Sequence, residues 1–178
     1  VMHWWHGEKH GVRTRISDDG LFLAYAVANY VKISGDRQIL DETAAYLDSP
    51  CLAATEESRF EIPKYHEKHE SVLMHLERII ERAYDVGENG LLKIRGGDWN
   101  DALNIDDPEA ESVFMAMAMA WACKELAALS RFLGDNAYAQ QLLEQRAALV
   151  ETINRKAWDR EWYLRAFSKF GPVGSKSS

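Results

Sequence analysis

The sequence is poor in cysteine: its 178 residues contain only Cys51 and Cys123. Small secreted domains that depend on disulfides have many more, so two cysteines do not suggest a disulfide framework. This usage indicates a reducing compartment. We therefore expect a cytoplasmic protein.

An excess of positive charge is also lacking. Lysine and arginine total 21 against 28 aspartates and glutamates, a formal net charge of −7. A nucleic-acid surface needs a basic patch, so we expect no nucleic-acid partner. No apolar run reaches the length of a membrane span and no signal peptide is visible, so no membrane partner is expected. The chain starts at Val1 without a methionine, which indicates a piece of a longer protein.

Helical periodicity is the main signal that is present. Apolar side chains recur at helical spacing over four long segments, at about 20–33, 69–86, 111–132 and 137–157. The first segment is apolar nearly all round, which predicts a helix buried on every side. We therefore predict an all-α fold of about four long helices in two hairpins.

The connecting segments predict little regular strand. Glycines interrupt residues 1–16, a short helix is expected at about 37–46, and residues 48–66 read as a loop. The tail at 158–170 is rich in aromatic residues and is expected to be strand or loop. Short and long loops alternate along the chain. The long ones should therefore meet at one end of an α/α array and build one shared site.

The densest chemistry lies in the stretch from Gly96 to Asn104, which reads Gly-Gly-Asp-Trp-Asn-Asp-Ala-Leu-Asn. A calcium loop that starts at Asp98 would place Asn100 third, but Ala102 and Leu103 fall where an oxygen ligand and a glycine are required. A purely structural set of Asx turns would explain the asparagines but not a tryptophan beside an aspartate.

Cleavage of a glycosidic bond is the third interpretation of this stretch. That reaction needs a carboxylic acid to protonate the leaving oxygen, and a nucleophile. A carboxyl held against an aromatic ring loses hydration of its charged form, so its pKa rises; Asp101 beside Trp99 fits this role. No second carboxylate is evident as a base, and Asp98 is expected to hold the loop in shape. An anionic nucleophile such as inorganic phosphate needs no protein base, only arginines to hold it.

Three histidines near the N-terminus are candidate metal ligands. Gly7 and Gly11 disrupt the helix that would place His3, His6 and His10 on one face, and no cysteine lies nearby. We therefore expect solvated or sugar-facing histidines and no metal.

Several strings occur together, in a fixed order, over nearly the whole chain. They are His3-Trp4-Trp5-His6, Gly11-Val12-Arg13-Thr14-Arg15-Ile16-Ser17-Asp18-Asp19, Gly97-Asp98-Trp99-Asn100-Asp101, Glu111-Ser112-Val113, Trp162-Tyr163-Leu164-Arg165-Ala166-Phe167 and Gly174-Ser175. With them the sequence resembles glycoside hydrolase family 94. That family holds inverting cellobiose, chitobiose and related β-glycoside phosphorylases and the phosphorylase-like domain of cyclic β-1,2-glucan synthases.

The resemblance implies a fold and a set of roles. Residues 1–178 would be a fragment of a single (α/α)6 catalytic barrel domain, without the N-terminal β-sandwich and the C-terminal part of the barrel. Asp101 would be the general acid, and Arg13, Asp19 and Trp99 would bind the sugar whose bond is broken. Phosphate would attack the anomeric carbon of a β-linked gluco-oligosaccharide with inversion and release an α-sugar 1-phosphate.

The resemblance also sets what else is needed. It implies no metal and no organic cofactor, only inorganic phosphate as co-substrate, and a homodimer of the full-length protein. The family's phosphate-binding histidine and Thr-Gly pair have no counterpart here, so the fragment alone is expected to be inactive. Two alternatives stay open: an inverting glycoside hydrolase on the same barrel, and a non-catalytic carbohydrate-binding helical domain.

Overall fold

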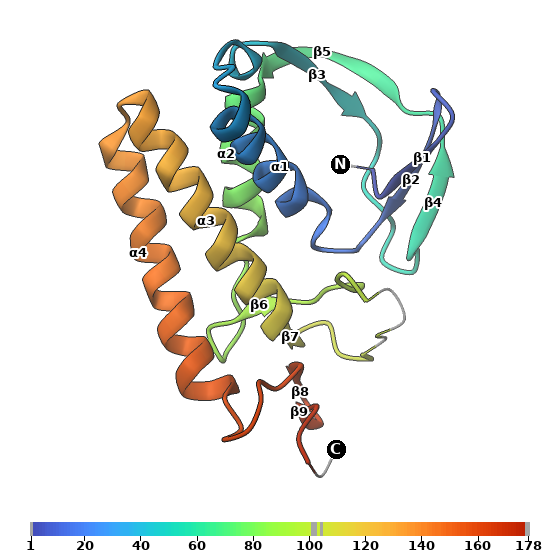
Figure 1. The fold of residues 1–178 in the computed structure, drawn as a ribbon. Coiled ribbons are helices and arrows are strands. Elements are labelled where there is room, and N and C mark those ends of the chain that lie inside the picture. The colour runs from blue at the N-terminus through green and yellow to red at the C-terminus, as the bar shows by residue number, and fades with distance from the viewer. Residues whose placement is uncertain (1, 101–102, 104, 177–178) are drawn as a thin grey trace.

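The computed structural model describes residues 2–100, 103 and 105–176. Over these residues the chain forms four α-helices and nine strands, and the strands make three antiparallel sheets (Figure 1). The prediction of an all-α fold is therefore wrong. The helices stand side by side, and the strands β1, β2 and β4 form a separate lobe to the right of them in Figure 1.

The four helices lie where the apolar periodicity placed them. Their bounds are Asp19–Ser34 for α1, Val72–Ala83 for α2, Val113–Leu133 for α3 and Asn136–Thr152 for α4, which continues as a π-helical turn, η2, at Ile153–Ala157. Side chains of Ser71, Ser112 and Asp135 accept backbone N–H groups at the starts of α2, α3 and α4. Such caps satisfy donors that have no partner within the helix.

Helix α3 is the centre of the core. It packs against α4 on one side and α1 on the other, and α1 packs against α2. Met115 and Met119 are buried and fill part of this core. Among the described residues α3 is the one helix long and apolar enough to cross a membrane, with a mean hydropathy of 1.4, but 67% of that stretch is buried inside the protein. A core helix passes the same test.

Helix α1 is not buried on every side. Leu21, Ala24, Ala28 and Val31 face the core. Four other apolar side chains of α1 are between 44% and 84% exposed, namely Phe22, Leu23, Tyr30 and Ile33. The absence of a polar face therefore does not correspond to burial all round in this chain.

Two of the sheets lie in segments that were predicted to be irregular or helical. One comprises β1 (Trp4–His6), β2 (His10–Thr14) and β4 (Ser58–Glu61), and the other β3 (Thr43–Asp48) and β5 (Lys64–Ser71). The short helix expected at 37–46 is reduced to the 3-10 turn η1 at Gln38–Leu40. Most of β5 is exposed on both faces, so its residues do not alternate between apolar and polar. The sequence therefore gives no periodic signal from which this strand could be predicted.

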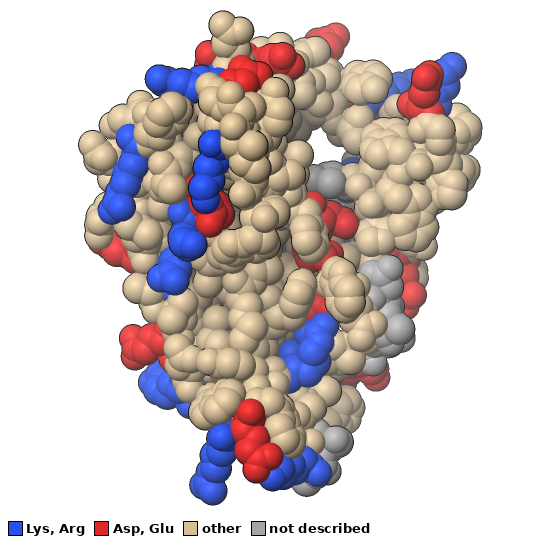
Figure 2. Space-filling model, viewed as in Figure 1, with Lys and Arg blue, Asp and Glu red and all other residues tan. Residues whose placement is uncertain are grey.

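The β3–β5 ribbon arches from the helices to the lobe of β1, β2 and β4 (Figure 1). The space-filling view shows an opening between the helices and this strand lobe, beneath the β3–β5 ribbon (Figure 2). On the face shown, acidic and basic side chains are interspersed without a large patch of one sign.

The third sheet joins the tail to the start of α3. It consists of β6 (Leu92–Lys93), β7 (Glu111–Ser112), β8 (Ala166–Ser168) and β9 (Gly171–Val173). Strand β7 leads directly into α3, and β8 pairs with it. The tail is therefore partly strand. It lies against the N-terminal end of α3, next to β7.

Candidate functional site

Two segments distant in sequence are hydrogen-bonded along the entry to α1. The Ser17 hydroxyl donates to the carbonyls of Gly97, at 2.9 Å, and Ile94, at 3.1 Å. The Ser17 backbone N–H also donates to the Gly97 carbonyl, and the Gly96 N–H donates to Arg15. The segment at 15–17 and the loop at 94–98 therefore form one unit, which brings the two motif regions together.

Gly96 is required by this close approach. A Cβ at position 96 would lie 2.6 Å from the Cβ of Arg15, closer than real carbon atoms come. Only glycine lets the two backbones meet here. The glycine that leads into the dense loop thus has a packing reason.

Asp98 is the buried anchor of that loop. Its side chain has no exposed surface. One carboxylate oxygen accepts the Ser112 hydroxyl at 2.5 Å, and the other accepts the backbone N–H of Asn100 at 3.1 Å and the guanidinium of Arg165. A buried charge is tolerated when it is paired and hydrogen-bonded in this way. The expectation that Asp98 holds the loop in shape agrees with these contacts.

Trp99 presents its ring to solvent. The residue is 69% exposed, and its ring centroid lies 6.3 Å from that of Phe114, with the planes tilted by 40°. The Arg165 guanidinium lies over the other ring of this pair, 5.8 Å from the Phe114 centroid. An exposed indole on an anchored loop suits stacking against a flat apolar face such as that of a sugar ring.

Two adjacent carboxylates stand at the start of α1. Asp19 contacts His3, with 2.8 Å between Oδ1 and Nδ1. Asp18 is buried, and burial, together with the charges of Asp19 and Asp98, raises its pKa from 3.8 to about 6. The charge of Asp98 acts on Asp18 because the start of α1 lies near the loop at 94–98.

Arg13 is engaged with the protein itself. Its Nε donates to the Ser49 hydroxyl at 2.8 Å and lies 3.5 Å from Oε1 of Glu61. Over the part of the chain that the structure describes, no hydrogen bond or ion pair joins Arg13 or Asp19 to Trp99. Arg13, Asp19 and Trp99 therefore belong to backbone segments that are hydrogen-bonded to each other, but their side chains contact different residues.

Asp101, the expected acid, lies outside the described residues, as do Ala102 and Asn104. Its placement relative to Trp99 therefore stays a prediction.

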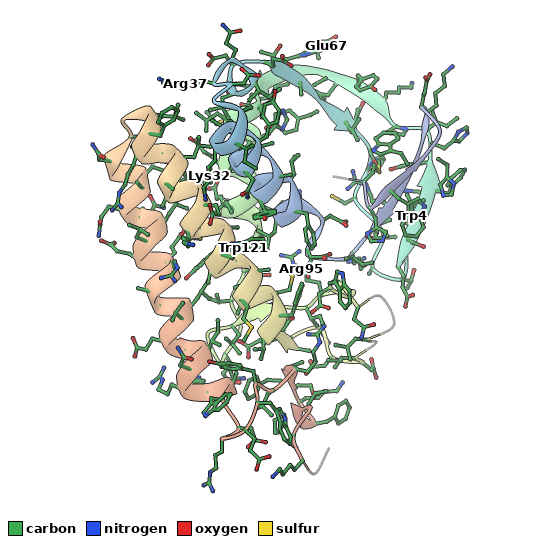
Figure 3. All side chains as sticks on the ribbon, in the orientation of Figure 1. Trp4, Lys32, Arg37, Glu67, Arg95 and Trp121 are labelled. Atoms are coloured by element: carbon green, nitrogen blue, oxygen red, sulfur yellow. The ribbon has the colours of Figure 1, made fainter. Side chains whose placement is uncertain are left out.

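The three N-terminal histidines each have an identified neighbour. His3 bonds to Asp19, His6 accepts the indole N–H of Trp4 at 2.6 Å, and His10 stacks on Phe60 with 5.2 Å between ring centroids. Figure 3 shows Trp4 on the strand lobe, away from Trp121 on α3. Within the described residues no cluster of three His, Cys, Asp or Glu side chains is arranged to hold a metal ion.

Sequence reasoning missed the partners of Asp98. Arg165 is 67 residues away from Asp98 in the sequence. It belongs to one of the family strings, but no role was predicted for it. Ser112 was seen as part of another string, although a serine just before an apolar helix is a recognisable cap. Nothing in the sequence indicated that this cap would also bind Asp98.

These strings and their arrangement agree with a comparison against protein families. Residues 3–178 match the family model described as the glycosyl hydrolase 94 superfamily, catalytic domain, and the chain belongs to that family. It is 32% identical over 98% of its length to the cyclic beta-(1,2)-glucan synthase NdvB of Rhizobium meliloti. It is also 32% identical over 89% of its length to the solabiose phosphorylase of Paenibacillus borealis. For the N,N'-diacetylchitobiose phosphorylase of Vibrio proteolyticus the identity is 28% over 91% of the chain.

The chain spans a small part of these relatives. The matched region is 6% of the synthase, 19% of the solabiose phosphorylase and 18% of the diacetylchitobiose phosphorylase.

Proposed function

We propose that this chain supplies the sugar-binding and acid-bearing part of an enzyme that cleaves a β-linked gluco-oligosaccharide by inverting phosphorolysis. The observation that carries the proposal is the hydrogen-bonded unit of residues 15–17 and 94–98, which joins the segment of Arg13 and Asp19 to the loop of Trp99. Membership of the family and similarity to two phosphorylases support the class of reaction.

In the proposed reaction Asp101 is the general acid. The bond from the anomeric carbon to the leaving sugar breaks, and the Asp101 proton goes to the leaving oxygen. A phosphate oxygen bonds to the anomeric carbon from the opposite face and gives an α-sugar 1-phosphate. The proton of hydrogen phosphate can then restore the acid. No metal or organic cofactor takes part.

Sugar binding is assigned to Trp99, Arg13 and Asp19. The exposed Trp99 ring offers a stacking face. Asp19, fixed by His3, and Arg13, fixed by Ser49 and Glu61, are polar groups held in defined positions from which they can hydrogen-bond hydroxyl groups. Groups held in this way bind with less loss of side-chain entropy.

The test is the change Asp101→Asn in the complete protein. Loss of a general acid lowers turnover of an unactivated disaccharide by about 100- to 10,000-fold. Sugar 1-phosphate release is followed with and without inorganic phosphate, and circular dichroism checks that the variant is folded. Turnover at the original rate in a folded variant would exclude Asp101 as the acid.

The same assay decides between the alternatives. Release of free sugar without phosphate would indicate an inverting hydrolase, and oligosaccharide binding without any turnover would indicate a carbohydrate-binding domain. We further propose a homodimer in the cytoplasm, which sedimentation and cell fractionation of the full-length protein would test.

A further inference from the structure

We infer that Arg165 is a positioning residue for the reaction: through Asp98 it fixes the turn at Trp99 and Asn100 that leads to the expected acid. This inference rests on the proposed function. Arg165 lies 67 residues beyond Asp98 in the sequence, next to strand β8.

The contacts of Arg165 form a closed set. One terminal nitrogen donates to Asp98, and the other donates to the Ser112 hydroxyl at 3.2 Å. That hydroxyl donates to the second Asp98 oxygen at 2.5 Å and accepts the Met115 N–H at 3.0 Å at the start of α3. The guanidinium therefore spans the loop anchor and the helix cap at once.

The backbone of Arg165 is held as firmly as its side chain. Its N–H donates to the Val173 carbonyl at 2.8 Å, and its carbonyl accepts the Val113 N–H at 3.2 Å. These bonds fix the backbone of Arg165 relative to α3. The side chain therefore starts from a position that the fold sets.

The effect on the loop passes through Asp98. Its Oδ1 accepts both Arg165 and the Asn100 backbone N–H, so the carboxylate closes the turn that holds Trp99. The guanidinium also packs over Phe114, whose ring neighbours Trp99. Loss of the guanidinium would remove two supports of the turn at once. Asp98 would lose its ion pair, and Phe114 would lose the group that packs over its ring.

Lysine cannot replace this arrangement. An ammonium group is a single point charge, whereas the planar guanidinium presents several donors in a fixed fork. Arg165→Lys should keep the charge but lose either the Ser112 contact or the packing over Phe114. We expect its activity to lie between those of the natural protein and Arg165→Ala.

The test compares two substrates in the complete protein. Arg165→Ala should lower kcat for phosphorolysis of a disaccharide by about 100-fold, the scale of loss that follows a misplacement of about 1 Å. On a dinitrophenyl β-glycoside the loss should be about tenfold or less, since the phenolate leaves without a proton from the acid. Guanidinium chloride at non-denaturing concentration should restore part of the disaccharide activity.

Arg78→Gln is the matched control. Arg78 also pairs with a carboxylate, 2.5 Å from Glu70, but it lies on α2, outside the unit of residues 15–17 and 94–98, and its side chain is 45% exposed. This variant should keep both activities. Equal losses on the two substrates by Arg165→Ala, or no recovery with guanidinium, would overturn the inference.

Removal of Arg165 leaves Asp98 buried and unpaired, and the single variant could fail to fold. The double variant Asp98→Asn with Arg165→Gln keeps the pair neutral. It should fold and still be slow on the disaccharide but not on the aryl glycoside; full disaccharide activity in it would contradict the inference.

Failure of the two proposals can be told apart. If Asp101→Asn turns over the disaccharide normally, the proposed acid is wrong. Recovery of Arg165→Ala with guanidinium does not depend on which residue is the acid, so it tests Arg165 independently.

Discussion

Asp18 carries a carboxyl group whose ionised form is disfavoured in the folded protein. Burial is the main cause, and the neighbouring charges of Asp19 and Asp98 add to it, so the pKa rises from 3.8 to about 6. A raised pKa means that the fold is weakened as pH increases from about 4 to about 6, and that this loss persists above pH 6. At 1.36 kcal/mol per pKa unit the loss is at most about 3 kcal/mol.

Asp18→Asn should therefore stabilise the protein at neutral pH. The Asp18 side chain makes no cap hydrogen bond at the start of α1, so the change to asparagine removes none. We expect an increase in the free energy of unfolding of about 1–3 kcal/mol at pH 8 and almost none at pH 4, because the Asp18 carboxyl is then protonated in the folded protein and, like asparagine, carries no charge. Urea unfolding at the two pH values measures this. An equal gain at both would show that the charge is not the cause.

At the scale of elements, the predictable part of the fold is the part with a one-sided apolar pattern. Helix α2 has such a stripe and was found in place. The exposed β5 strand has none, and β7 is only two residues long, so neither leaves a periodic signal. The candidate site behaves likewise. Asp98 could be assigned a structural role from its neighbours, but the pairing with Arg165 depends on a sheet that the sequence does not reveal.

Glu111 in β7 holds the turn that links α2 to β6. The residue is 2% exposed, and its carboxylate accepts the N–H groups of Asn89, at 3.1 Å, and Leu91, at 3.0 Å, and the Asn89 side-chain amide at 2.6 Å. Glu111→Ala removes the acceptor for all three donors. We expect a loss of about 3–5 kcal/mol in the free energy of unfolding, measured by urea denaturation.

Glu109→Ala serves as its control. The Glu109 side chain is 70% exposed and pairs with Lys93 at 2.7 Å. An exposed ion pair contributes little, so this variant should change stability by about 0.5 kcal/mol or less. Similar losses in the two variants would mean that the turn is not what Glu111 stabilises.

On the scale of the whole molecule, the helices form one continuous core around α3. Cys123 lies in that core with no exposed surface, and burial raises the pKa of its thiol to about 12. Cys51, by contrast, is exposed. The Cys51 thiol is therefore accessible in the native protein, whereas the Cys123 thiol becomes accessible only when the core opens.

A thiol reagent should modify one cysteine in the native protein and two in denaturant. Thiolates react and buried thiols do not, so Cys123 becomes reactive only when the core opens. Mass spectrometry after brief treatment with iodoacetamide gives the count. Cys51→Ser should leave the native protein unmodified, and rapid labelling of Cys123 in that variant would show that the core opens locally.

The Ser112 hydroxyl serves two structures at once, as the cap of α3 and as a partner of Asp98. Its two neighbours in the network, Asp98 and Arg165, come from a loop and from the tail. A substitution at one of the three positions removes a hydrogen-bond partner of the other two and so changes which residues are tolerated there. Among relatives of this chain, these positions should therefore vary as a set, and lineages that lose the arginine should have replaced the aspartate as well.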